Sequence, residues 1–387
     1  STANAEDAGM MSLSDVVQKA LTTHPEYQQA EKLIDSAKEG VTQAKAGYLP
    51  KVDLNLATGY ERTENLSTAN AKVAAPYKSG EAKENRQEAS LTVYQMLFDG
   101  FATPARVEQA KYALENQTYY GQEIADKVTL AATKAFYDVL LESNNLDINE
   151  DNLRTHKNYQ SQIQRRVNSG KSNRADLEQV NARVALAQAQ LIQRQELLEN
   201  AKAEFLRQTG VESGLLMDEN LDFSIVPSSL NEAVQVSHEY NPRLKSLESS
   251  VKSSRSAIKE AKAAYMPRFD LEFGATRNQN IDGVESKDHD ESAMVRMQYN
   301  LYNGGADKAK HKASIAESDA SLKHLEDARR EVTKNVRSAW YEYQLTSKRL
   351  TALSAQVKAS KATKIAYKSQ FDVGQRTLLD VIDSERE

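Results

Sequence analysis

The apolar residues of this chain follow two different periods, and the change from one to the other occurs twice. Ahead of Pro50 and Pro267, apolar and small residues recur in alternating steps of four and three, the heptad spacing of a helix that packs along a narrow seam. Directly after each proline the period becomes two, which is typical of a strand. Because proline cannot donate the next helical hydrogen bond, each marks the end of a helix. The pattern therefore predicts a helix over residues 13–47 and another before Pro267, each followed by a strand.

Each predicted strand has an apolar face and a polar face. On the outgoing strands the apolar faces carry Val52, Leu54, Leu56 and Tyr60 in the first half and Phe269, Leu271 and Phe273 in the second. On the return strands they carry Ala293, Val295, Met297, Tyr299 and Leu301, and more weakly Leu91, Val93 and Leu97, where Gln95 interrupts the row. A half-buried soluble sheet explains any one of these strands, but the flanking helices are too polar to cover a sheet. Four such strands are typical of a membrane barrel.

Four strands are too few for a closed barrel, for which about eight is the minimum. Unpaired strand edges are not tolerated in lipid. We therefore expect the chain to pool its strands with copies of itself, in a number that this argument does not fix.

The chain contains the same long passage twice. The segment AKAGYLPKVDLNL (residues 44–56) recurs 217 positions later as AKAAYMPRFDLEF (residues 261–273). LFDG (97–100) recurs 204 positions later as LYNG (301–304), and the same offset relates Gly170 to Gly374 and Asp176 to Asp380. The offset changes within 61–88 and 278–291, where we expect loops of different length; the second would contain Lys287–Glu291. This period indicates a duplicated half-protein.

Very long helices follow each hairpin, and few prolines interrupt them. We expect each to span on the order of 95 Å at 1.5 Å per residue. The predicted first repeat covers residues 1–210, with a helix, a β-hairpin at 48–98 and helices at 103–167 and 175–209. A linker covers 211–229. The second repeat covers 230–387, with a helix, a hairpin at 266–302, a helix at 306–371 and a return helix at 377–387, which the repeat would extend by roughly 26 residues.

Composition narrows the function classes. The net charge of −5 provides no basic face, so we expect no nucleic-acid partner. The chain has no cysteine, which excludes disulfides and thiolate metal sites. No apolar run is long enough for a transmembrane helix. The histidines share no ligand spacing and no catalytic motif occurs, so we expect neither an enzyme nor a cofactor. The start at Ser1 is that expected of a mature end after signal cleavage, or of a cloning boundary.

The order of elements, performed twice, resembles the TolC family of outer-membrane channel proteins. The most specific stretches are AGYLPKVDLNL with its repeat, YQMLFDG and YNLYNGG before the long helices, and FDVGQRTLLDVIDSE at the second turn. The resemblance implies a mainly α fold with transmembrane β: a homotrimer whose twelve strands, four per chain, form one outer-membrane barrel, continued by a long α-helical barrel across the periplasm. It also implies a Gram-negative host and contact with outer-membrane lipid.

The resemblance implies an exit duct that docks on a periplasmic adaptor and an inner-membrane transporter. Because Ser1 rather than cysteine stands first, the chain is more similar to the non-lipidated secretion branch, which pairs with an ABC exporter. We therefore expect type I protein secretion. The alternatives are a multidrug efflux pump with a proton-driven transporter and, less well supported, a soluble coiled-coil scaffold, which leaves the two hairpins unexplained.

The family's periplasmic gate motif, G-x-R-T-x-x-D-x-x-D, reads Gly374 to Asp383 in this sequence. The resemblance implies that Gly170 and Gly374 lie at the tips of the helix turns and that Arg376 and Asp176 form a polar latch. Asp380 and Asp383 lie three apart on one helix face, so threefold symmetry would place six carboxylates around the axis. An acid in the first helical turn also complements the helix dipole, which explains Asp176 as well. Phe371 stands where the family latch has a tyrosine, so a hydroxyl link is not available there.

Overall fold

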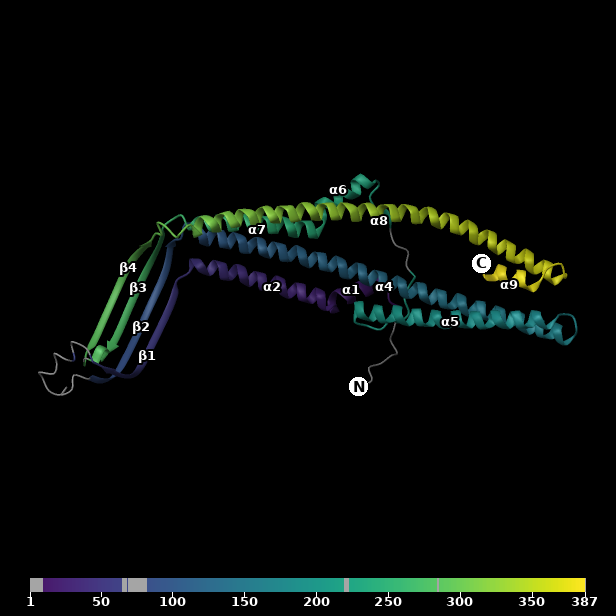
Figure 1. The fold of residues 1–387 in the computed structure, drawn as a ribbon, viewed down its shortest axis with the longest axis horizontal. Helices are drawn as coiled ribbons and strands as arrows, with labels where there is room; N and C mark the ends of the chain where they lie inside the picture. Colours follow the sequence, from purple (N-terminus) through teal and green to yellow (C-terminus); the bar gives the residue numbers. More distant parts are fainter. Residues whose placement is uncertain (1–9, 65–67, 69–81, 219–222, 284, 387) are drawn as a thin grey trace. The chain divides into compact units, whose positions relative to one another are not determined.

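The computed structural model describes residues 10–64, 68, 82–218, 223–283 and 285–386 (Figure 1). The first half contains α1 (Leu13–Thr23), α2 (Pro25–Lys45), the 3-10 turn η1 (Ala46–Tyr48), β1 (Lys51–Thr63), β2 (Ala82–Phe98), α4 (Ala102–Asn168) and α5 (Arg174–Thr209). The second contains η3 (Phe223–Ile225), α6 (Leu230–Tyr240), α7 (Pro242–Ala263), β3 (Arg268–Gln279), η4 (Ile281–Gly283), β4 (Lys287–Gln298), α8 (Ala306–Asp372) and α9 (Leu378–Arg386). No helix in the described ranges is long and apolar enough to cross a membrane.

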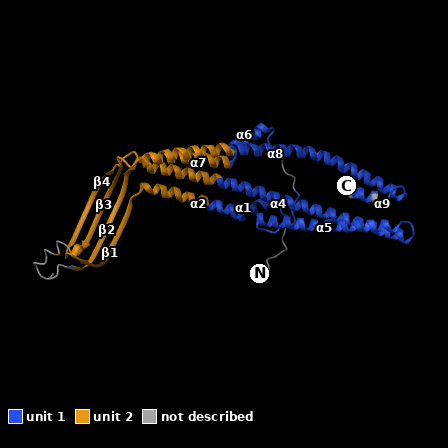
Figure 2. Cartoon of the chain, viewed as in Figure 1, with its two compact units in different colours: residues 1–32, 120–242, 329–387 blue, residues 33–119, 243–328 orange. Residues whose placement is uncertain are grey.

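The chain divides into two spatial units, each of which takes residues from both halves of the sequence (Figure 2). One unit comprises residues 1–32, 120–242 and 329–387 and consists of helices. The other comprises residues 33–119 and 243–328 and holds the whole sheet together with the helix segments that adjoin it. Each spatial unit therefore contains parts of both sequence repeats.

The helix predicted over residues 13–47 is two helices, which corrects that prediction. His24 is extended between α1 and α2, with φ −68° and ψ 121°, because a residue that precedes proline avoids the helical region. Asn241 repeats this before Pro242, with φ −63° and ψ 120°. Pro25 and Pro242 are 217 positions apart and each is the first residue of its helix, where a missing N–H costs nothing.

The four strands form one antiparallel sheet in the order β1-β2-β3-β4. Its register places Val52 opposite Val93, Val93 opposite Phe273, and Phe273 opposite Ala293, so the apolar rows of all four strands lie on one face. Val52, Leu54 and Leu56 are 60%, 64% and 71% exposed, so none of the residues that the structure describes covers this face at β1. The prediction of four strands with one apolar face is confirmed.

The strands differ from prediction at their ends. Residues 82–88 and Lys287–Glu291, predicted as loop, belong to β2 and β4, because the sheet extends its pairing beyond the apolar rows that the sequence pattern detects. Conversely, Tyr299 and Leu301 follow the end of β4. Gln95 interrupts the apolar row because its amide donates to the carbonyls of Tyr48, at 3.0 Å, and Met96, at 2.9 Å.

The LFDG motif joins the sheet to α4. The Asp99 carboxylate accepts bonds from the backbone N–H of Thr103, at 2.7 Å, and from its hydroxyl, at 2.6 Å, and so caps the helix. Gly100 has φ 69°, and a Cβ there would lie 2.6 Å from the carbonyl oxygen of Ala263. Only glycine fits this close approach of α4 and α7.

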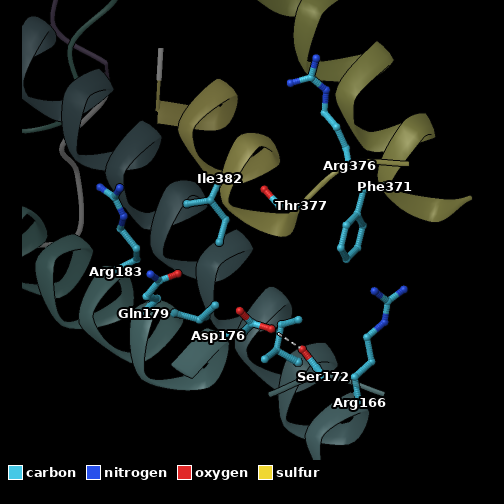
Figure 3. Close-up of a pocket in the computed structure, with 11 residues that line it drawn as sticks. Arg166, Ser172, Asp176, Gln179, Arg183, Phe371, Arg376, Thr377 and Ile382 are labelled. Carbon is cyan, nitrogen blue, oxygen red and sulfur yellow. Dashed lines mark hydrogen bonds between the residues drawn. The ribbon is translucent and has the colours of Figure 1, made fainter. Parts of the chain in front are cut away.

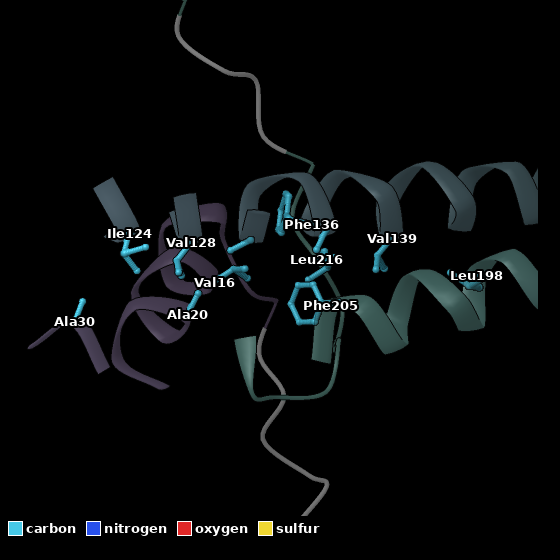
Figure 4. Packing of buried hydrophobic residues seen from close by; sticks show 12 residues of the cluster. Val16, Ala20, Ala30, Ile124, Val128, Phe136, Val139, Leu198, Phe205 and Leu216 are labelled. Atoms are coloured by element: carbon cyan, nitrogen blue, oxygen red, sulfur yellow. The ribbon is translucent and has the colours of Figure 1, made fainter. Parts of the chain in front are cut away.

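Two apolar clusters hold the helical unit together. The first joins α1, α4 and α5 through buried residues that include Val16, Phe136 and Phe205, all fully buried (Figure 4). The second joins α4, α5, the end of α8 and α9. In α5, Val180, Val184, Ala187, Leu198 and Phe205 are buried.

Candidate functional site at the two helix turns

The turn that joins α4 to α5 has a regular helix stop. Gly170 has φ 72°, and its N–H donates to Val167 O at 3.0 Å while Lys171 N–H donates to Arg166 O at 2.8 Å. These two bonds are those of a Schellman motif, which glycine favours because of its positive φ. The Asn173 side chain then caps α5 by accepting the N–H of Asp176 at 2.8 Å.

The turn that joins α8 to α9 repeats this geometry. Gly374 has φ 78°, its N–H donates to Phe371 O at 3.0 Å, and Gln375 N–H donates to Gln370 O at 2.9 Å. Thr377 Oγ1 accepts the N–H of Asp380 at 3.4 Å and donates to its carboxylate at 2.9 Å. Gly170 and Gly374 therefore occupy equivalent helix stops.

A cavity of about 200 Å³ lies where the two turns meet (Figure 3). Its apolar part includes Ile163, Val180, Phe371 and Ile382, and its polar part holds three arginines and Asp176. The arginines are Arg166 of α4, Arg183 of α5 and Arg376 of the second turn. The turns therefore meet around an apolar floor with an excess of guanidinium groups.

Each arginine has a partner within the chain. Arg166 lies over the ring of Phe371, 4.5 Å from its centroid, and Arg376 lies over Tyr367 at 3.6 Å. Arg183 forms a 2.9 Å ion pair with Asp383. Arg166 of the first turn therefore packs on a buried ring of the second.

Arg376 and Asp176 line the same cavity but bond to different groups. Arg376 donates to Gln370 Oε1 at 2.8 Å and lies 3.7 Å from the Asp380 carboxylate. The Asp176 carboxylate accepts the Ser172 hydroxyl at 2.7 Å (Figure 3). A direct Arg376–Asp176 latch stays a prediction. The structure brings the two side chains to one cavity and supplies Tyr367 as an aromatic partner one turn before Phe371.

Both predicted constriction carboxylates have cationic neighbours within the chain. Asp380 is adjacent to Arg376, and Asp383 is paired with Arg183. Asp383 remains 53% exposed and Asp380 42%, so solvent still reaches both carboxylates. These pairs join α9 to its own turn and to α5, and they offset part of the negative charge expected from six carboxylates around a threefold axis.

A buried polar cluster lies beside the cavity, and the sequence analysis did not find it. His156 of α4 is 5% exposed, and its Nδ1 and Glu385 Oε2 of α9 are buried without a hydrogen-bond partner among the described residues. Burial lowers the pKa of His156, the Glu385 carboxylate raises it in part, and Arg183 lowers it further. Glu385 Oε1 accepts from Lys364 of α8 at 2.6 Å.

Tyr159 completes this cluster. Burial raises its pKa, and the charges of Glu385 and Asp372 add to that shift. The cluster therefore ties α9 to α4 and α8 through groups whose charge depends on pH. Its members lie far apart in the sequence and share no motif, so no sequence signal would have found them. Within the described residues, no group of three His, Cys, Asp or Glu side chains has the arrangement of a metal site.

Comparisons with known proteins agree with the fold. The family model described as "Outer membrane efflux protein" matches residues 16–211 and 233–387. The alkaline protease secretion protein AprF of Pseudomonas aeruginosa is 23% identical over 393 residues, with 98% of this chain and 80% of AprF covered. The proteases secretion protein PrtF of Dickeya chrysanthemi is 22% identical over 394 residues, with 98% of this chain and 83% of PrtF covered.

Solved structures show the same fold at low identity. A crystal structure of CusC superimposes with a TM-score of 0.82 at 16% identity, covering 97% of this chain and 85% of CusC. The open-state structure of the MtrE outer membrane channel of Neisseria gonorrhoeae gives a TM-score of 0.79 at 16% identity, covering 97% of this chain and 82% of MtrE. The chain belongs to the outer membrane efflux protein family, has the fold of TolC-like channels, and is located in the Gram-negative outer membrane, from which it extends into the periplasm.

Proposed function

We propose that this protein is the outer-membrane exit duct of a type I protein secretion machine. The observation that carries the proposal is the sheet, whose four strands expose an apolar face while long polar helices continue from it. An exposed apolar face of this kind is stable in contact with lipid. Such a duct performs no chemistry and conducts its cargo passively.

We propose a homotrimer, because one chain cannot close its own sheet. β1 and β4 are the two edges of the sheet, and each needs a partner strand within the membrane. The C-terminal half of α8 supports the same assembly. Exposed apolar side chains recur along it, namely Tyr341, Leu345, Leu350, Val357 and Ile365, with exposed fractions of 54%, 59%, 60%, 51% and 68%. Neighbouring copies would cover these side chains.

Secretion is preferred to drug efflux because AprF and PrtF, both named as protease secretion proteins, match almost the whole chain. The partners would be a periplasmic adaptor and an inner-membrane ABC exporter. An efflux role with a proton-driven pump is the second candidate, supported by the outer membrane efflux protein BepC of Brucella suis at 22% identity over 353 residues.

Deletion of the gene from its host separates the two candidates. For secretion, we expect one or a few large proteins to disappear from the culture medium, measured by mass spectrometry, while drug susceptibility changes less than twofold. Complementation with the wild-type gene is the control. An unchanged medium together with a several-fold rise in drug susceptibility would contradict secretion and support efflux.

The gate roles of Asp380 and Asp383 are part of this proposal. If the two carboxylates of each copy face the axis, then Asp380→Asn with Asp383→Asn should abolish cation preference and divalent block in planar-bilayer recordings. Asp176→Asn, in the equivalent first turn, is the matched control and should leave selectivity in place. Unchanged selectivity of the double variant would exclude the constriction role.

A further inference from the structure

The two faces of the sheet carry opposite charge at the end distant from the helices. β1 follows η1 and β2 leads into α4, so the hairpin end of the sheet lies beyond residues 57 and 88. Side chains alternate between faces along each strand, and directly paired residues share a face. The β2–β3 pairing shifts register between Met96 and Phe98, near the helices, but all three pairings are regular toward the hairpin end, so each paired side chain there is assigned to one face.

The apolar face becomes basic at this end. Going outward from the helices, its rows run from Val52/Val93/Phe273/Ala293 through Leu54/Leu91/Ala275/Glu291 to Leu56/Ala89/Arg277/His289 and Thr58/Gln87/Gln279/Lys287. Arg62 and Lys83 pair farther out on the same face. We call Arg62, Lys83, Arg277, Lys287 and His289 the basic end; Glu291 is the carboxylate that shares this part of the face.

The opposite face is acidic at the same level. Its paired positions include Glu61 with Glu84 and Glu88 with Asn278 and Asp288, and Asp290 lies two residues along β4. Arg86 is the basic residue at the hairpin end of this face, and it forms ion pairs with Glu61, at 3.2 Å, and Glu88, at 2.5 Å. A sheet charged only for solubility would mix both signs on both faces, so the segregation requires a different environment for each face.

Basic side chains of this end face other basic side chains across the strands. Arg62 faces Lys83 across β1 and β2, and Arg277 faces the imidazole of His289 across β3 and β4. Arg277, Lys287 and His289 are exposed and form no ion pair with a carboxylate of the described chain. These basic side chains therefore lack the carboxylate partners that Arg86 has within the described chain.

A groove of about 720 Å³ lies over this region, and Leu56, Arg277, Lys287 and His289 line it together with residues that the register assigns to the opposite face, Glu88 among them. Apolar and cationic groups thus meet in one groove. This combination matches a lipid, whose chains lie along the apolar rows and whose phosphate lies at the guanidinium and ammonium groups. Because the helices extend into the periplasm, the hairpin end of the sheet reaches the outer leaflet.

We propose that the basic end binds the phosphate groups of the phosphorylated glycolipid that forms the outer leaflet. The inference rests on the lipid contact of the apolar face and is independent of the cargo that the duct exports. The acidic face would repel the same phosphates, so the charge segregation also fixes which face meets lipid. The partner is a membrane component, because the cations continue the apolar rows rather than the opposite, acidic face.

The test compares lipid binding of two charge-neutralised variants of the full chain, each purified in a neutral detergent. The first variant carries Arg277→Gln, Lys287→Gln and His289→Gln, and the control carries Glu88→Gln, Asp288→Asn and Asp290→Asn on the opposite face. Retention of diphosphoryl lipid A is measured by native mass spectrometry. With about a fivefold effect for each permanent charge near a lipid surface, the first variant should lose roughly 25-fold in affinity, and the control less than twofold.

Inorganic phosphate at millimolar concentration should not compete with lipid A. A lipid A that lacks both phosphates should bind the wild type and the first variant with equal affinity. Equal retention by the wild type and the first variant, equal loss in both variants, or full competition by inorganic phosphate would each overturn the proposal. Lys287→Gln alone, with an expected loss of about fivefold, serves if the triple variant does not assemble. The oligomeric state of the wild type is measured separately, from the mass of the intact assembly. A monomeric wild type would contradict the duct proposal and not the lipid proposal.

Discussion

The turns at the ends of α4 and α8 have the same backbone and different side-chain chemistry. Both end in a glycine with positive φ, both form the same pair of bonds to the preceding helix, and both begin the next helix with a polar cap. At equivalent positions, however, Ser172 corresponds to Arg376 and Val167 to Phe371. Both turns hold their aspartate with a hydroxyl, Ser172 in the first and Thr377 in the second, and the second turn adds the Arg376 guanidinium beside its aspartate.

This difference shows which features a duplication must preserve. Glycine and a capping side chain determine the path of the chain, so both copies keep the glycine and a cap, Asn173 in the first turn and Thr377 in the second. The side chains between them do not affect that path, and the second turn uses them to build two cation–aromatic contacts, Arg376 with Tyr367 and Arg166 with Phe371. The second contact joins the two turns, so the asymmetry is itself what packs one turn against the other.

The largest effect should come from Phe371, at the junction where the two turns pack together. Phe371 is 6% exposed and belongs to the second apolar cluster, so Phe371→Ala should destabilise the junction by about 3–5 kcal/mol. The equivalent Val167→Ala removes a smaller, half-buried side chain and should cost about 1 kcal/mol. Hydrogen exchange of the α9 amides measures both losses. Equal losses in the two variants would show that the turns contribute symmetrically.

A smaller effect is expected at Arg376. Arg376→Gln removes the contact with Tyr367 and the partly exposed pair with Asp380, which together stabilise the turn by about 1 kcal/mol. We expect a several-fold increase in channel opening in planar bilayers. Ser172→Ala, the matched change in the first turn, removes one hydroxyl–carboxylate hydrogen bond that lies within the first turn, so it should change opening less than twofold. If Ser172→Ala increased opening more than Arg376→Gln, the first turn and not the second would hold the channel closed.

The smallest effect concerns pH. Burial lowers the pKa of His156, so the unfolded chain binds its proton more readily than the folded protein. The stability that neutral His156 supports is therefore present above the unfolded value of about 6.5 and decreases as the pH falls below it. At pH 6 the loss should be less than about 1 kcal/mol. Hydrogen exchange of α9 at pH 8 and pH 6 should show it in the wild type and in Tyr159→Phe, but not in His156→Gln; the same loss in His156→Gln would exclude this source.

The sequence predicted the elements whose signals are local. The long helix expected at 103–167 is observed at Ala102–Asn168, and the one expected at 306–371 at Ala306–Asp372, because proline, glycine and cap residues mark these ends. The break at Pro25 was missed although Pro242 repeats it at the same offset. Heptad spacing continues through a proline at the first position of a helix, so the apolar pattern alone did not detect the break.

The side-chain partners at the candidate site could not be predicted in the same way. The sequence identified Gly170, Gly374, Asp176, Arg376, Asp380 and Asp383 as belonging to the turns. It did not identify Arg183 as the partner of Asp383, nor the orphaned atoms of His156 and Glu385. These pairs join helices that are distant in the sequence, and their geometry depends on how α9 packs against α4 and α5.

The central claim is that the two edges of the sheet pair between copies of the chain. The protein has no cysteine, so Asn55→Cys in β1 and Ser292→Cys in β4 introduce the thiols needed to test it. Treatment of intact outer membranes with a short bismaleimide should convert the double variant into a covalent trimer on a denaturing gel, while each single variant remains a monomer. A double variant that stays monomeric, or that fractionates with proteins soluble without detergent, would contradict the account.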